Sequence, residues 1–258
     1  FFFKQKTAYE IYQCDWSSDV CSSDLEAEGI INRFGFNNVG VDIAVENIRA
    51  SKYKGVLGVN IGKNFDTPIE KAVEDYILCM KKVYQYANYI AINISSPNTK
   101  NLRDLQETKA LNVLLAQLKE EQTRLADYYG RYVPIALKIS PDLTIKQLDA
   151  ISKSIIKNRI DGVIATNTTV SRESVSNFSH GNEVGGMSGK PLFGLSNSII
   201  RELHSRLQGE LPIIGVGGIF SGDDALEKIN AGAELVQIYS GLIYQGRKLV
   251  LDACHSIG

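Results

Sequence analysis

Asparagine side chains stand at or just after the ends of short apolar runs. Asn60 lies in G-V-N-I, Asn93 closes I-A-I-N, and Asn167 follows G-V-I-A-T. A buried amide is costly unless its donors and acceptors are bonded. Three such amides therefore indicate a polar ligand with both donor and acceptor edges, for which a planar heterocycle is suitable. Each Asn taken alone could equally cap the helix that comes after it.

One positive charge ends a further apolar run, where Lys138 stands in A-L-K-I-S-P-D. Inside a site, an ammonium group would stabilise an anion that develops during a reaction. The alternative is a lysine that water solvates. The sequence thus adds one candidate cation to the asparagine set.

Two glycine-containing stretches, I-I-G-V-G-G-I-F-S-G-D-D and I-Y-S-G, follow the last two apolar runs. Bare backbone N–H groups at this point of a barrel commonly face a phosphate. The stretches offer Gly217 and Gly218, and then Tyr239 and Ser240. The first stretch does not meet G-x-G-x-x-G, because Phe220 replaces the third glycine. A dinucleotide site is therefore only weakly indicated.

A long connection, residues 170–195, contains G-G-M-S-G-K-P-L and has little periodicity. Connections longer than about 12–15 residues without regular structure usually have a function. We expect this one to act as a lid or a phosphate contact, with Ser188 and Gly189 adding to the phosphate cradle.

The composition excludes several classes of protein. The net charge of -1, from 28 basic and 29 acidic residues, argues against a nucleic-acid partner. The four cysteines form no C-x-x-C pair and the three histidines stand apart, so we expect no metal site. No apolar run approaches the ~18 residues of a membrane span.

Short β-rich runs alternate with helical patterns from Gly29 onward, which predicts parallel βα units. The predicted strands are 55–61, 89–94, 134–139, 162–166, 212–216 and 235–239. The predicted helices are 67–86, 105–129, 144–158, 196–207, 222–231 and 248–255. Residues 30–50 predict a loop followed by a further helix.

The fold class that fits this alternation is an α/β, TIM (β/α)8 barrel. Such a barrel has eight strands and carries its working residues at their carboxyl ends. The sequence offers about six of the eight βα units, so we expect an incomplete barrel with unpaired edges at its first and last strands. An open doubly wound sheet is the alternative.

Residues 1–25 differ in character from the rest of the chain. They begin with Phe, show no helical or strand period, and resemble a translated sequencing adapter. We expect this head to be non-native and disordered, with the barrel domain spanning 26–258. A genuine disordered arm is the alternative.

Eight motifs in order carry a resemblance to a known family. They are I-N-R-F-G-F-N-N, G-V-N-I-G-K-N, I-A-I-N-I-S-S-P-N-T, A-L-K-I-S-P-D, G-V-I-A-T-N-T-T, G-G-M-S-G-K-P-L, I-I-G-V-G-G-I and V-Q-I-Y-S-G. Together they resemble the quinone-dependent (class 2) dihydroorotate dehydrogenases over essentially all of 30–258. The resemblance implies an FMN barrel that oxidises dihydroorotate to orotate in pyrimidine synthesis, with a quinone as the electron acceptor.

The resemblance also implies roles for individual residues. Those expected to bind FMN are Asn60, Asn93, Lys138, Thr166, Ser188, Gly189, Gly217, Gly218, Tyr239 and Ser240. Those expected to bind the substrate are Asn32, Arg33, Phe34, Gly35, Phe36, Asn93, Asn98, Asn167 and Thr168.

Ser96 matches the catalytic base of the family. A serine hydroxyl is a weak base alone and needs an outlet for the proton. The resemblance suggests Thr99 as that outlet and Phe36 as a shield over the path. Class 1 relatives have cysteine at the base position, so Ser96 favours the quinone-dependent class.

Two parts of the family pattern are missing from this sequence. They are the first strand, with its flavin and substrate contacts, and the N-terminal helices that dock on the membrane. We therefore expect a peripheral protein on the cytoplasmic side of the cell membrane for the full-length parent, and a cytoplasmic fragment here. The alternatives are another FMN barrel, such as a class 1 or dihydropyrimidine dehydrogenase-like enzyme, and an inactive fragment.

Overall fold

The computed structural model describes residues 21–24 and 26–258. Its main element is a six-stranded parallel sheet in the order β3-β4-β5-β6-β8-β9. The strands are β3 Gly58–Ile61, β4 Tyr89–Asn93, β5 Ile135–Ile139, β6 Gly162–Ala165, β8 Ile213–Val216 and β9 Leu235–Gln237. All six lie within the predicted runs, so the α/β class and the parallel order are confirmed.

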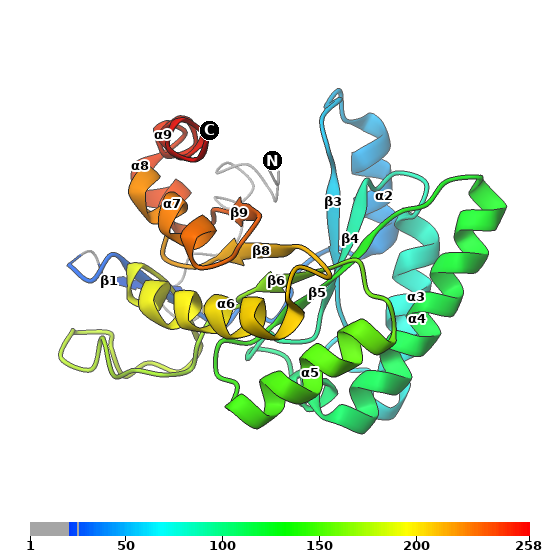
Figure 1. The fold of residues 1–258 in the computed structure, drawn as a ribbon, viewed down its shortest axis with the longest axis horizontal. Coiled ribbons are helices and arrows are strands. Elements are labelled where there is room, and N and C mark those ends of the chain that lie inside the picture. Colours follow the sequence, from blue (N-terminus) through cyan, green and yellow to red (C-terminus); the bar gives the residue numbers. More distant parts are fainter. Residues whose placement is uncertain (1–20, 25) are drawn as a thin grey trace.

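The helices that precede β9 connect consecutive strands and lie side by side on the outer face of the curled sheet, and two more helices follow β9 (Figure 1). They are α2 Val41–Ala50, α3 Ala72–Val83, α4 Thr108–Tyr129, α5 Ile145–Lys157, α6 Phe193–Leu207, α7 Gly222–Asn230, α8 Ser240–Gln245 and α9 Lys248–Ile257. Single 3₁₀ turns are η1 Ile69–Lys71, η2 Leu102–Gln106 and η3 Lys190–Leu192. Only the short α8 was not predicted among these α-helices.

The sheet does not close. Within the described residues, β3 pairs only with β4, and β9 pairs only with β8. The two open edges are the predicted ones, so the expectation of an incomplete barrel is confirmed.

A second sheet was not predicted. It is antiparallel, in the order β1-β2-β7, with β1 Cys21–Asp24, β2 Gly29–Asn32 and β7 Gly186–Gly189. The prediction of no strand in 1–25 is therefore wrong for 21–24, and 1–20 and 25 lie outside the described residues. The expectation of an unstructured 170–195 is likewise wrong at β7. Each of these strands has only four residues, which is too short to show a clear period. β1 pairs with the neighbouring β2, whereas β2 pairs with β7 across more than 150 positions, which local periodicity does not reveal.

Strand alternation separates the hydrophobic core from the site. Ile61, Ile92 and Leu137 point outward into the core shared with the helices. Ala91 and Ala136 point to the opposite, concave side, in a small apolar cluster. Because successive side chains of a strand alternate between faces, the polar residues two positions further along also lie on the concave side.

Candidate active site at the carboxyl ends of the strands

Three predicted polar residues meet at adjacent strand ends. β4 and β5 pair Asn93 directly with Lys138. Asn167 follows β6, and its Nδ2 donates to Asn93 Oδ1 over 3.1 Å. Asn93 is only 5% exposed, and its own Nδ2 donates no hydrogen bond to the described residues. The bonding thus leaves the two Asn93 N–H groups available to a ligand.

Ser95, for which no role was predicted from the sequence, joins these strand ends. Its fully buried hydroxyl donates to the Lys138 carbonyl over 2.7 Å and accepts from Asn167 Nδ2 over 2.9 Å. Since a hydroxyl has one proton, donation to Lys138 makes Ser95 Oγ an acceptor for Asn167. Ser95 therefore determines which way the Asn167 amide faces. Its only sequence signal was its place beside the candidate base.

Lys138 is a half-buried cation at the end of β5. Burial lowers the pKa of its ammonium to about 8. Among the described residues, the side chain forms no hydrogen bond or ion pair. A buried ammonium without a partner would be stabilised by an electronegative atom of a bound ligand. The predicted role of Lys138 in binding the flavin is of this kind.

The candidate base lies on the loop after β4. Ser96 is 7% exposed, and its Oγ accepts a 3.3 Å hydrogen bond from the Asn98 backbone N–H. Thr99 is also buried, and its hydroxyl has no hydrogen-bond partner among the described residues. The two hydroxyls are not bonded to each other. Phe36 packs its ring against Gly62, just beyond β3.

The predicted substrate loop, 32–36, lies against the Asn98 turn. Asn98 Nδ2 donates to the Asn32 carbonyl over 2.8 Å and to Asn32 Oδ1 over 3.1 Å. Gly35, at φ 64°, lies so close that a Cβ there would be 3.1 Å from the Asn98 carbonyl oxygen. Arg33 instead forms a 3.1 Å ion pair with Glu183 on the long connection.

The remaining substrate candidates are placed by backbone contacts. The Thr168 carbonyl accepts from Arg103 over 3.0 Å, and Thr168 Oγ1 lies against Gly186 of β7. The Phe34 side chain is half-buried. The substrate set therefore joins the loop after β2, the turn after β4 and the end of β6.

The predicted phosphate residues gather where the two sheets meet. Ser240 donates to Ser188 over 2.8 Å, and Ser188 donates to the Ile30 carbonyl over 3.3 Å. Gly189, at φ 95°, would place a Cβ 2.3 Å from the Glu28 carbonyl oxygen. Any side chain there would displace the backbone.

Gly217 and Gly218 follow β8 and pack on the start of α6. A Cβ on Gly218, at φ 76°, would lie 2.5 Å from Phe193 Cα. One on Gly217 would lie 3.1 Å from Leu192, which ends the turn that Gly189 begins. The glycines are thus adjacent parts of one backbone-lined region. Tyr239 is 47% exposed at the start of α8.

Two further flavin candidates lie at the ends of β3 and β6. Asn60 of β3 is paired with Ala91, and its buried Oδ1 has no hydrogen-bond partner among the described residues. Thr166 is 2% exposed at the end of β6, where its N–H donates to the Val216 carbonyl over 2.9 Å.

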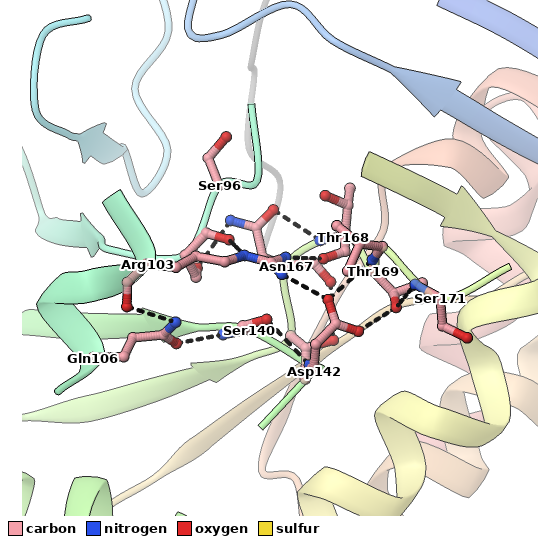
Figure 2. A network of polar contacts seen from close by, with 12 residues as sticks. Ser96, Arg103, Gln106, Ser140, Asp142, Asn167, Thr168, Thr169 and Ser171 are labelled. Carbon is pink, nitrogen blue, oxygen red and sulfur yellow. Dashed lines mark hydrogen bonds and ion pairs between the residues drawn. The ribbon is translucent and has the colours of Figure 1, made fainter. Parts of the chain in front are cut away.

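A salt-bridged network behind the site holds the strand ends together, and sequence reasoning missed it (Figure 2). Arg103 donates to the Ser95 carbonyl over 3.1 Å and to Asp142 over 2.8 Å. Asp142 also accepts from the Thr169 hydroxyl and, over 3.0 Å, from the Val170 N–H. No local pattern marks these residues, because most of their partners, such as Asp142 and the Thr168 carbonyl for Arg103, lie 39 and 65 positions away in the chain.

Among residues 21–24 and 26–258, no group of three or more His, Cys, Asp or Glu side chains could hold a metal ion. A parallel α/β sheet with polar side chains at the carboxyl ends of its strands defines a barrel-type enzyme site. The chain belongs to the dihydroorotate dehydrogenase family, because the family model described as Dihydroorotate dehydrogenase matches residues 23–258.

Curated relatives agree with this assignment. The chain is 60% identical over 233 residues to the dihydroorotate dehydrogenase (quinone) of Methylobacillus flagellatus, covering 90% of this chain and 69% of that protein. It is 61% identical over 228 residues to the protein of the same name from Photobacterium profundum, covering 88% and 68%. A crystal structure of DHODH from Eimeria tenella in complex with ferulenol is also similar, with a TM-score of 0.87 and 31% identity, covering 93% of this chain and 69% of that chain.

Proposed function

We propose that this protein oxidises dihydroorotate to orotate with a bound flavin and passes the electrons to a quinone, in pyrimidine biosynthesis. The observation that carries the proposal is the joined set of Asn93, Lys138 and Asn167 at adjacent strand ends, beside Ser96. The names of the relatives supply the substrate and the acceptor.

FMN is the flavin that the residues fit. Within the part of the chain that the structure describes, the buried Asn60 carbonyl accepts no hydrogen bond and the Lys138 ammonium has no ion pair, so both could bind the edge of a flavin ring. Gly189 and Gly218 leave backbone where a Cβ would collide, which suits a phosphate. Bound there, the flavin would supply the acceptor for the hydride. The residues proposed to hold it are Asn60, Asn93, Lys138, Thr166, Ser188, Gly189, Gly217, Gly218, Tyr239 and Ser240.

Ser96 Oγ is the proposed base that takes the substrate proton. Its hydroxyl already accepts the Asn98 N–H, which leaves a lone pair for the second proton and its own proton for a relay. The Thr99 hydroxyl, which has no partner in the described part of the chain, is the proposed next carrier of the proton. Phe36, whose ring packs against Gly62 just beyond β3, is the proposed shield that would limit access of water.

The substrate's carboxylate and ring would be held by amide and backbone donors. Asn93 contributes its two free N–H groups, and Asn98 fixes the 32–36 loop through Asn32. The residues proposed to bind the substrate are Asn32, Arg33, Phe34, Gly35, Phe36, Asn93, Asn98, Asn167 and Thr168.

A turnover assay tests the function. The chain is incubated with FMN and dihydroorotate, and orotate formation is followed with a quinone, fumarate or NAD as the only oxidant. We expect turnover with the quinone alone. Preference for fumarate or NAD would place the protein with the class 1 or dihydropyrimidine-oxidising enzymes. Stoichiometric FMN binding without orotate formation would refute the proposed activity of this chain.

No helix in the described part of the chain is long and apolar enough to cross a membrane. Because a quinone is lipid-soluble, we propose that the full-length protein docks peripherally on the cytoplasmic side of the cell membrane. Flotation of full-length protein with lipid vesicles would support docking, and recovery in the protein-only fraction would refute it.

A further inference from the structure

A lysine outside the site described above is completely buried. Lys228 of α7 is 0% exposed, although lysine is almost never fully buried unless it is paired. Among the described residues its ammonium has only neutral partners: Ser196 Oγ at 3.0 Å, Asn197 Oδ1 at 2.6 Å and the face of the Phe193 ring at 4.7 Å. No carboxylate lies within ion-pair distance of it among the described residues.

Two of these contacts, Ser196 and Phe193, lead to the glycine turn after β8. Ser196 donates onward to the Val216 carbonyl over 2.7 Å, and Val216 immediately precedes Gly217. Phe193 is the residue against which Gly218 packs. The ammonium is thus one side chain removed from the backbone proposed to bind a phosphate.

The charges around Lys228 do not neutralise it at close range. On α7, the Asp224 carboxylate accepts a hydrogen bond from the Phe220 N–H, and the Glu227 carboxylate accepts one from Asn197 Nδ2 over 3.4 Å. On α6, Arg201 opposes the ammonium, while β8 carries no ionisable side chain. Burial is the largest influence, and the pKa of Lys228 falls to about 7.

We propose that Lys228 is a positioning and specificity residue that holds a positive charge behind Gly217 and Gly218, and so favours a flavin carrying a phosphate over one without it. The proposal rests on the proposed flavin site. A buried cation acts strongly on a nearby anion, because little water screens it. Phosphate binding and protonation of Lys228 therefore reinforce each other.

The test is calorimetric titration of the chain with FMN and with riboflavin at pH 8, in buffers of different ionisation enthalpy. At this pH the FMN phosphate is already a dianion, because its second pKa is about 6. Lys138 would take up the same number of protons with either flavin, because it contacts the ring that both share. The difference in proton uptake between FMN and riboflavin therefore reports the effect of the phosphate alone. We expect FMN to take up about one proton more than riboflavin, since a group with a pKa about one unit below the pH is mostly uncharged beforehand.

Variants separate charge from packing. Lys228→Met should weaken FMN binding about tenfold or more, abolish the extra proton uptake and leave riboflavin affinity unchanged. Lys228→Arg, which keeps a charge that does not titrate, should restore FMN affinity without the uptake. Lys153→Met, at an exposed position of α5, is the matched control and should change nothing.

Equal proton uptake for the two flavins would overturn the inference. Equal weakening of both flavins in Lys228→Met would also overturn it, by showing a purely structural role. Failure of the unchanged chain to bind either flavin would instead refute the proposed flavin site, and the inference with it.

Discussion

Ser95 contributes to the site although no pattern in the sequence indicated a role for it. Its hydroxyl orders the Asn167 amide and ties β4 to β5 through the Lys138 carbonyl. Ser95→Ala removes both bonds, each worth about 1 kcal/mol, so we expect kcat/KM for dihydroorotate to fall about 10- to 30-fold. Ser171→Ala, whose hydroxyl only accepts a 3.5 Å bond from Glu173, should leave it unchanged. Steady-state kinetics with FMN-saturated protein checks both, and equal effects would contradict the assigned role.

Lys138 is a single residue that should make flavin binding depend on pH. Burial lowers the pKa of its ammonium to about 8, so the charge is present below that pH and is lost above it. We expect riboflavin affinity to fall between pH 7 and 9, because riboflavin carries no phosphate and reports the ring site alone. Lys138→Met should bind more weakly and without this pH dependence. Fluorescence titration measures both, and a flat profile for the unchanged chain would disprove the ring contact.

At the scale of elements, repeating local patterns predicted what they could encode. The six parallel strands and the helix that Thr144 caps were all visible, because apolar period and capping chemistry are local. The four-residue strands β1, β2 and β7 were not visible, because runs this short show little period and β2 pairs with β7 across more than 150 positions. The same limit applies to the site. Asn93 and Lys138 could be predicted because they end apolar runs, whereas Arg103 and Asp142 could not, because no local sequence pattern indicates their long-range contacts.

Arg103 joins three elements, so its loss should be costly. The guanidinium contacts the Ser95 carbonyl after β4, Asp142 after β5 and the Thr168 carbonyl after β6. Arg103→Met leaves a mostly buried Asp142 without its ion pair, and we expect the free energy of unfolding to fall by about 2–3 kcal/mol. Lys82→Met, which breaks a solvent-exposed pair with Asp42, should cost less than about 1 kcal/mol. Urea unfolding compares the two, and similar losses would show that the network does not stabilise the fold.

The whole molecule, as far as the structure describes it, ends in two unpaired sheet edges. Apolar side chains are exposed beside each edge, including Phe65 after β3 at 58% and Leu235 in β9 at 36%. Open edges with apolar side chains pair readily with other chains, and a charge on the edge suppresses this. We therefore expect the chain to self-associate as its concentration rises, and Leu235→Lys to shift the association to higher concentration. Leu251→Lys on α9, at 59% exposure, adds the same charge away from the edge and should have little effect. Sedimentation velocity measures the shift, and an equal response to both lysines would show that net charge, rather than the open edge, governs association.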